Sequence, residues 1–225
     1  MPPVDGKPKT LKLSPSRLNT FRECPRCFWN DIHGLGPPSG PMSSLPQAMD
    51  LIVKDYYDKH RAAGLPPLLK GKLPVKLVDP KTAAMVRAYI NWTDPETGAV
   101  LRGKMDDCFV DGKGQLVIMD NKTRGFDVKE ILDIYLFQLD TYAFLLEKAG
   151  HKVAATGYLV YFIPERGTDI SKGVYFRAEP HKVKINPGRV LSVFRKAVDV
   201  AKQARPPAHH KECEMCIWVK GMVVL

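Results

Sequence analysis

The sequence predicts an α/β protein in which helices flank a central mixed β-sheet. Two observations favour this class. Apolar runs typical of strands alternate with segments whose apolar residues recur every three or four positions, and a strong hairpin signal joins two of the runs. With 225 residues, 44% hydrophobic and 26% charged, the chain can bury a core, which excludes disordered and collagen-like classes. We expect one domain over 1–225, divided into a helical part (14–96), an α/β core (97–204) and a cysteine-bearing tail (205–225).

The helical part is predicted from its capping residues and its apolar spacing. Ser14 followed by Pro15 is typical of a helix start, because serine can cap free backbone N–H groups and proline fits the first turn. The segments that follow are a loop at 34–46, an amphipathic helix at about 47–63, a Pro-interrupted segment at 64–80 and a short helix at 82–92.

The core is predicted to begin with a β-hairpin. The runs 99–110 and 115–120 are rich in strand formers, and the Asp-Gly-Lys-Gly sequence between them indicates a tight turn. The downstream elements are a helix at 127–148 ended by Gly150, a central strand at 153–163, shorter strands at 174–177 and 183–185, and a helix at 187–204.

The charge balance favours a polyanionic partner. Lys and Arg number 34 against 24 Asp and Glu, a formal net charge of +10, which suits nucleic acid. No apolar run approaches the ~20 residues of a membrane-spanning helix, and the N-terminus lacks the apolar stretch of a secretory signal. We therefore expect a cytoplasmic protein without a membrane partner.

Acidic residues interrupt or end both apolar runs of the predicted hairpin. Asp106 and Asp107 lie within the first run, and Asp120 is followed two residues later by Lys122, on the same face of an extended strand. Carboxylates beside an ammonium group can bind Mg²⁺ or Mn²⁺, which leaves coordination positions for a phosphate oxygen and activates water. A charge pair at the frayed end of a surface hairpin is the simpler alternative.

The register of the hairpin decides which first-strand acid faces Asp120. A two-residue turn at Gly112-Lys113 would pair Val110 with Gln115 and select Asp107. A three-residue loop or a bulge would select Asp106.

These motifs resemble those of a known nuclease family. Gly-x-hydrophobic-Asp at 103–106 and Asp-x-Lys at 120–122 resemble motifs II and III of the PD-(D/E)xK nuclease superfamily. Gln138 and Tyr142 match the Q-x-x-x-Y motif of its RecB-like clade, which includes CRISPR-associated exonucleases, and 13–29 is similar to the clade's N-terminus. The resemblance spans Leu13 to Trp218 and implies a restriction-endonuclease-like core.

The resemblance also implies roles for individual residues, and it selects Asp106 over Asp107. The implied catalytic positions are Asp106, Asp120, Lys122, Gln138 and Tyr142. Asp106, Asp120 and the backbone carbonyl of Asn121 would bind Mg²⁺ or Mn²⁺. The clade usually adds an early helical histidine, for which Asp50 is the candidate here, with a solvated surface acid as the open alternative. Arg124 and Lys129, just after the second strand, are candidate contacts to DNA phosphates.

Four of the five cysteines form two C-x-x-C pairs, Cys24/Cys27 and Cys213/Cys216, which together can complete a tetrahedral sulfur site. Cys108, within a β run, is expected to be buried. Many RecB-like nucleases join their N- and C-terminal segments with a 4Fe–4S cluster, and the resemblance favours that cofactor over zinc, which four thiolates also suit. Phe28, Trp29 and Trp218 lie nearby in sequence and are candidates for base stacking or for core packing.

Together these features predict a metal-dependent deoxyribonuclease. The clade suggests an exonuclease that acts on DNA ends or single strands, in repair, recombination or CRISPR adaptation, with a helicase or a CRISPR or repair protein as partner. The alternative is a non-catalytic module that binds nucleic acid through a nuclease fold.

Overall fold

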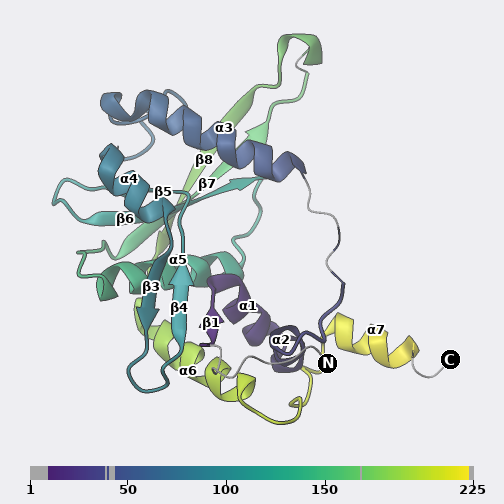
Figure 1. Ribbon diagram of the computed structural model, residues 1–225. Helices are drawn as coiled ribbons and strands as arrows, with labels where there is room; N and C mark the ends of the chain where they lie inside the picture. The colour runs from purple at the N-terminus through teal and green to yellow at the C-terminus, as the bar shows by residue number, and fades with distance from the viewer. Residues whose placement is uncertain (1–9, 39, 41–43, 168, 223–225) are drawn as a thin grey trace. The chain divides into compact units, whose positions relative to one another are not determined.

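The computed structural model describes residues 10–38, 40, 44–167 and 169–222 (Figure 1). The chain forms two compact units. The first, here called the terminal unit, comprises Met1–Pro37, Asn91–Arg102 and Leu191–Leu225. The second, the sheet unit, comprises Pro38–Ile90 and Gly103–Val190.

A five-stranded sheet of order β2-β5-β6-β7-β8 forms the centre of the sheet unit. Its strands are β2 (Lys76–Leu77), β5 (Asp107–Val110), β6 (Leu116–Thr123), β7 (Thr156–Pro164) and β8 (Phe176–Lys184). The β6–β7 pair is parallel and the others are antiparallel. The sheet is thus mixed, and the predicted α/β class with flanking helices is confirmed.

Two helices cover opposite faces of this sheet (Figure 1). Ile118 and Leu159 pack on one face with residues of α5 (Asp133–Lys148), whereas Val117 and Met119 pack on the other with residues of α3 (Ser44–His60). Because side chains alternate along β6, residues 118, 120 and 122 share the α5 face. The alternation therefore fixes the direction of both Asp120 and Lys122.

The helices of the sheet unit differ from expectation mainly at their ends. The helix expected at 47–63 is α3 followed by a 3-10 turn at Arg61–Ala63. The helix expected at 82–92 is α4 (Pro80–Arg87), because the Asp79 side chain accepts the N–H groups of Lys81 and Thr82 and so starts the helix earlier.

The helix expected at 127–148 begins later, at Asp133, and ends at Lys148 as predicted. Two features hold the preceding segment out of the helix. Asp127 forms an ion pair with Arg177 of β8, and Leu132 has an extended backbone conformation.

Tertiary contacts also divide or join the predicted strands. The run 99–110 forms two strands in different sheets, β4 (Val100–Gly103) and β5, and between them the N–H of Met105 donates to the backbone oxygen of Val86 in α4. The segments 174–177 and 183–185 instead belong to one strand, β8. It lies at the edge of the sheet, which is where a strand can contain a proline such as Pro180, because proline has no N–H to donate to a neighbouring strand.

The terminal unit contains a small sheet of order β1-β4-β3 and several helices. Its elements are β1 (Lys12–Leu13), α1 (Pro15–Glu23), α2 (Pro25–Ile32), β3 (Ile90–Thr93), β4, α6 (Val190–Ala201) and α7 (Glu214–Met222). The predicted cap of α1 is confirmed, since Ser14 Oγ accepts the N–H of Arg17. Arg195 of α6 binds the buried Asp94 carboxylate through two nitrogens, at 2.9 and 3.1 Å.

The final helices also differ from prediction. In place of a helix at 187–204, a 3-10 turn at Pro187–Arg189 precedes α6, which ends at Ala201. The cysteine-bearing tail, predicted without an element, forms α7. A further 3-10 turn at Ile170–Lys172 lies between β7 and β8.

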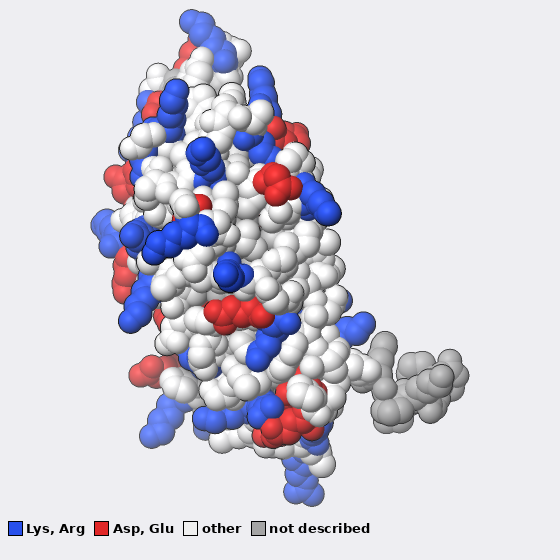
Figure 2. Space-filling model, turned by 90° about the vertical axis from the view of Figure 1, so that its left-hand side faces the viewer, with Lys and Arg blue, Asp and Glu red and all other residues white. Residues whose placement is uncertain are grey.

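The surface carries both signs of charge. On the face shown in Figure 2, Lys and Arg side chains are interspersed with Asp and Glu. Each helix in the described part of the chain is too short or too polar to cross a lipid bilayer.

Candidate active site and metal sites

The register of β5 and β6 places Asp106 opposite Asp120. Val110 pairs with Leu116 and Asp107 with Met119, so residues 111–115 form the connection rather than a two-residue turn. The Asp111 side chain stabilises this longer loop, because it accepts the N–H groups of Lys113 and Gln115, each at 2.9 Å. The register therefore differs by one residue from that of the two-residue turn, and it turns Asp107 away from Asp120.

Asp106 and Asp120 form a pair of largely buried carboxylates. Asp106 Oδ2 accepts the N–H of Asn121 at 3.2 Å, and Asp120 Oδ2 is buried without a well-aligned hydrogen bond, although Lys122 Nζ lies 2.6 Å away. Burial, then repulsion from Asp120, raises the pKa of Asp106 to about 6. Burial also raises the pKa of Asp120, despite the attraction of Lys122. Two carboxylates whose ionisation is disfavoured match the donor chemistry of a hard divalent cation.

Asp107 has a different environment from Asp106. It is fully buried and accepts hydrogen bonds from Arg61 Nη2 and Arg87 Nη2, both at 2.6 Å. Both guanidinium groups also contact Asp58, and Arg87 Nε donates to the backbone oxygen of Asp106 at 3.1 Å. This network neutralises Asp107 and supports the backbone beside the carboxylate pair.

Helix α3 contributes an acid and an amine to the same site. The ammonium group of Lys54 lies 2.6 Å from Asp50 Oδ2 and 3.6 Å from Asp106 Oδ1. The charge of Asp50 contributes to the raised pKa of both Asp106 and Asp120. The structure thus brings Asp50 to the carboxylate pair, and it adds Lys54, which sequence reasoning missed. Its position four residues after Asp50, on the same helix face, was the available signal.

Lys122 is held from the side of α5. Its ammonium group donates to Gln138 Oε1 at 3.1 Å and lies 4.5 Å from the ring centroid of Tyr135, while Gln138 Nε2 donates to the Tyr142 hydroxyl at 2.8 Å. The residues predicted from the Q-x-x-x-Y motif are therefore brought to the lysine. Tyr135 was missed as a site residue, although it stands three residues before Gln138 on the same helix face.

Asn121 directs its side chain to the other face of the sheet, where its Oδ1 accepts the hydroxyl of Tyr57 at 2.7 Å. Arg124 and Lys129 follow β6 and are exposed. Within the described residues neither contacts the carboxylate pair. Lys129 lines a cavity of about 640 Å³ together with Phe126 and Arg166.

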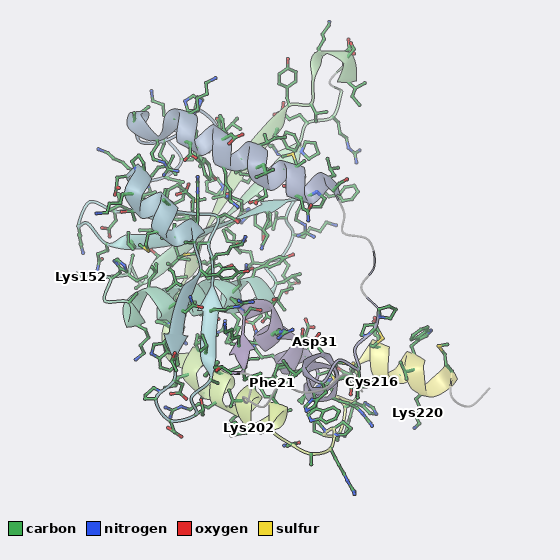
Figure 3. All side chains as sticks on the ribbon, in the orientation of Figure 1. Phe21, Asp31, Lys152, Lys202, Cys216 and Lys220 are labelled. Atoms are coloured by element: carbon green, nitrogen blue, oxygen red, sulfur yellow. The ribbon has the colours of Figure 1, made fainter. Side chains whose placement is uncertain are left out.

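The four cysteines of the two C-x-x-C pairs gather in the terminal unit. Their Sγ atoms all lie within 4.8 Å of one another, and Cys216, at the start of α7, faces α2 (Figure 3). Burial opposes ionisation of Cys24, but hydrogen bonds from the backbone of Cys27 and His210 lower its pKa to about 6. The fifth cysteine, Cys108, is fully buried in the sheet unit, as predicted.

The distances between the sulfur atoms can be compared with those expected around a single tetrahedral metal ion. Cys27 Sγ lies 3.5 Å from both Cys213 Sγ and Cys216 Sγ, and Cys24 Sγ lies 3.8 Å from Cys216 Sγ. Four thiolates on one Zn²⁺ at ~2.3 Å would be ~3.8 Å apart. In a 4Fe–4S cluster each thiolate binds a different iron, which requires a wider spacing.

The nearby aromatic residues differ in exposure. Phe28 and Trp29 are buried, and Trp29 Nε1 donates to the backbone oxygen of Gln203 at 2.9 Å. These two residues therefore belong to the core. Trp218 on α7 is 61% exposed.

Comparisons with known proteins identify the family and a similar fold. The model of the PD-(D/E)XK nuclease superfamily matches residues 76–220, which include the carboxylate pair, Lys122 and both late cysteines. The crystal structure of SSO0001 is similar in fold, with a TM-score of 0.52 and 15% identity over 95% of this chain and 86% of that chain. A comparison with curated proteins gives no match.

Proposed function

The chain belongs to the PD-(D/E)XK nuclease superfamily, and on this premise we propose that it is a metal-dependent deoxyribonuclease that hydrolyses phosphodiester bonds. The observation that carries the proposal is the pairing of Asp106 with Asp120 beside Lys122. Two adjacent carboxylates with raised pKa values destabilise the metal-free protein, and such groups are typical of functional sites.

Each residue has a role in this proposal. Asp106, Asp120 and the backbone carbonyl of Asn121 would hold Mg²⁺ or Mn²⁺, with Asp50 as a further carboxylate. When bound, the ion lowers the pKa of a water molecule and neutralises charge on the phosphoryl group. The Lys122 ammonium orients the attacking water, and Gln138 and Tyr142 fix the lysine from the side of α5.

The substrate is proposed to be DNA, at ends or in single strands. The net charge of +10 supports a polyanion, and the exposed Arg124 and Lys129 supply cations just beyond the strand that carries Asp120 and Lys122. The resemblance to RecB-like and CRISPR-associated exonucleases supports exonuclease action in repair, recombination or CRISPR adaptation. It also supports a helicase or another repair protein as partner, in the cytoplasm.

The cysteine cluster is proposed to be a structural metal site that ties α2 to α7. The resemblance favours a 4Fe–4S cluster, but the sulfur separations, of which three are 3.5 to 3.8 Å and all are within 4.8 Å, favour a single zinc ion. Metal analysis and the visible spectrum of the purified protein decide between them. We expect a colourless protein with one zinc per chain, whereas a brown protein with about four irons would contradict the zinc assignment.

A cleavage assay tests the nuclease proposal. Labelled single- and double-stranded DNA is incubated with Mn²⁺ or Mg²⁺, and the variants Asp120→Asn and Lys122→Met are compared with Asp169→Asn and Lys172→Met, a charge pair exposed on the β7–β8 connection. We expect the first two to lose at least ~100-fold in rate and the last two to retain wild-type activity. Salt-sensitive DNA binding without cleavage by the wild type would favour a binding module instead.

A further inference from the structure

Lys54 occupies an unusual position among the acids of the proposed active site. Its ammonium group lies 2.6 Å from Asp50 Oδ2 and 3.6 Å from Asp106 Oδ1, and its side chain is 20% exposed. Its charge also opposes the rise in pKa of both Asp106 and Asp120. Lys54 is therefore a cation among the carboxylates that would bind a metal ion.

The two lysines of the site are held in different ways. Lys122 has anchors on α5 that are independent of the acids, namely the Gln138 amide oxygen and the Tyr135 ring. Within the described residues, the contacts of the Lys54 ammonium group are with Asp50 and Asp106. A change at the carboxylates therefore leaves Lys122 in place and releases Lys54, whose four-carbon chain allows it to move towards solvent.

The charge balance explains why such a counter-ion is useful. Three carboxylates, Asp50, Asp106 and Asp120, face two ammonium groups. Without Lys54 the acids would carry two uncompensated negative charges at a site where Asp106 and Asp120 are largely buried, which is costly. A divalent cation that takes an oxygen of Asp106 supplies the compensation itself, and it repels the ammonium group.

We infer that Lys54 is a built-in counter-ion that competes with the divalent metal for Asp50 and Asp106, so that metal binding displaces its ammonium group. The inference rests on the proposed metal-dependent function. It makes Lys54 a residue that sets the metal concentration at which the site fills. Lys54 then stabilises the metal-free protein and weakens its affinity for the metal, two effects of opposite sign.

The test measures Mn²⁺ binding without DNA, by titration calorimetry at low ionic strength and with the cysteine site loaded. Mn²⁺ prefers oxygen ligands over thiolates, so it reports on the carboxylates. The variants are Lys54→Met, Lys54→Arg and, as a matched control on the same helix, the exposed Lys59→Met. We expect Lys54→Met to bind Mn²⁺ about tenfold more tightly, and the other two to bind as the wild type does.

Thermal unfolding of the metal-free proteins supplies the second readout. Lys54→Met should unfold at a lower temperature than Lys59→Met, and saturating Mn²⁺ should remove the difference. If Asp106→Asn abolishes Mn²⁺ binding but Lys54→Met leaves the affinity unchanged or weaker, the inference about Lys54 is overturned and the proposed metal site stands. If Mn²⁺ binding does not depend on Asp106, the proposed metal site fails, and the inference fails with it.

Discussion

The adjacent acids Asp106 and Asp107 should respond oppositely to the same substitution. Asp106 is placed in the proposed metal site, whereas Asp107 is buried between two arginines. Replacing Asp106 with Asn removes a charge that the metal-free protein disfavours, but it keeps an oxygen that can accept the N–H of Asn121. We therefore expect Asp106→Asn to abolish cleavage and to stabilise the metal-free protein.

The magnitude follows from the pKa of Asp106. A rise from 3.8 to about 6 corresponds to ~3 kcal/mol, at ~1.4 kcal/mol per pKa unit. The side chain is 27% exposed, so solvent screening reduces the effect and we expect a gain of about 1–3 kcal/mol. Because the pKa is raised on folding, ionisation destabilises the folded state as the pH rises from about 4 through 6. The gain from Asn should therefore be complete above pH 6 and absent near pH 4.

Asp107→Asn provides the matched comparison. This substitution removes the carboxylate that compensates the buried guanidinium of Arg61, whose side chain is 6% exposed, and we expect a loss of about 3 kcal/mol. Urea unfolding of both variants, in buffer without Mg²⁺ or Mn²⁺, measures these changes. The reasoning is refuted if Asp106→Asn destabilises the protein at pH 8, or if its gain is the same at pH 4.

Two further predictions concern residues of the same unit. Gly103→Ala should destabilise the protein by about 1–3 kcal/mol, because its Cβ would lie 3.0 Å from Leu145 and 3.1 Å from Tyr142; unchanged urea unfolding would contradict this close packing. Tyr135→Leu should lower kcat several-fold with little change in KM, because the Tyr135 ring, 4.5 Å from the Lys122 ammonium group, helps to hold it. A change in KM alone, measured by steady-state kinetics, would contradict this role for Tyr135.

The sequence was informative where local chemistry decides the structure. Residue spacing places Asp120 and Lys122 on one face, and Ser14-Pro15 starts a helix in the structure. The choice of Asp106 came from family resemblance, because a two-residue turn would have selected Asp107. The observed register depends on how the Asp111 side chain caps its loop, a detail that the Asp-Gly pattern alone does not specify.

Other features depend on contacts between distant segments, which periodicity cannot show. The strand run at 99–110 breaks where the backbone of Met105 bonds to Val86 of α4. Lys54 and Tyr135 looked like ordinary residues of amphipathic helices, and their proximity to the acids and to Lys122 arises from the packing of α3 and α5 on the sheet. The spacing of Lys54 from Asp50 and of Tyr135 from Gln138 was visible in the sequence, but the placed helices show which groups these side chains contact.

The most direct test of the active site is to locate Mn²⁺ in crystals by its anomalous scattering. We predict a single peak within coordination distance of Asp106 and Asp120, with Lys122 still in contact with Gln138. If Mn²⁺ instead binds elsewhere, or the two carboxylates bind no ion at saturating Mn²⁺, the proposed nuclease centre is contradicted.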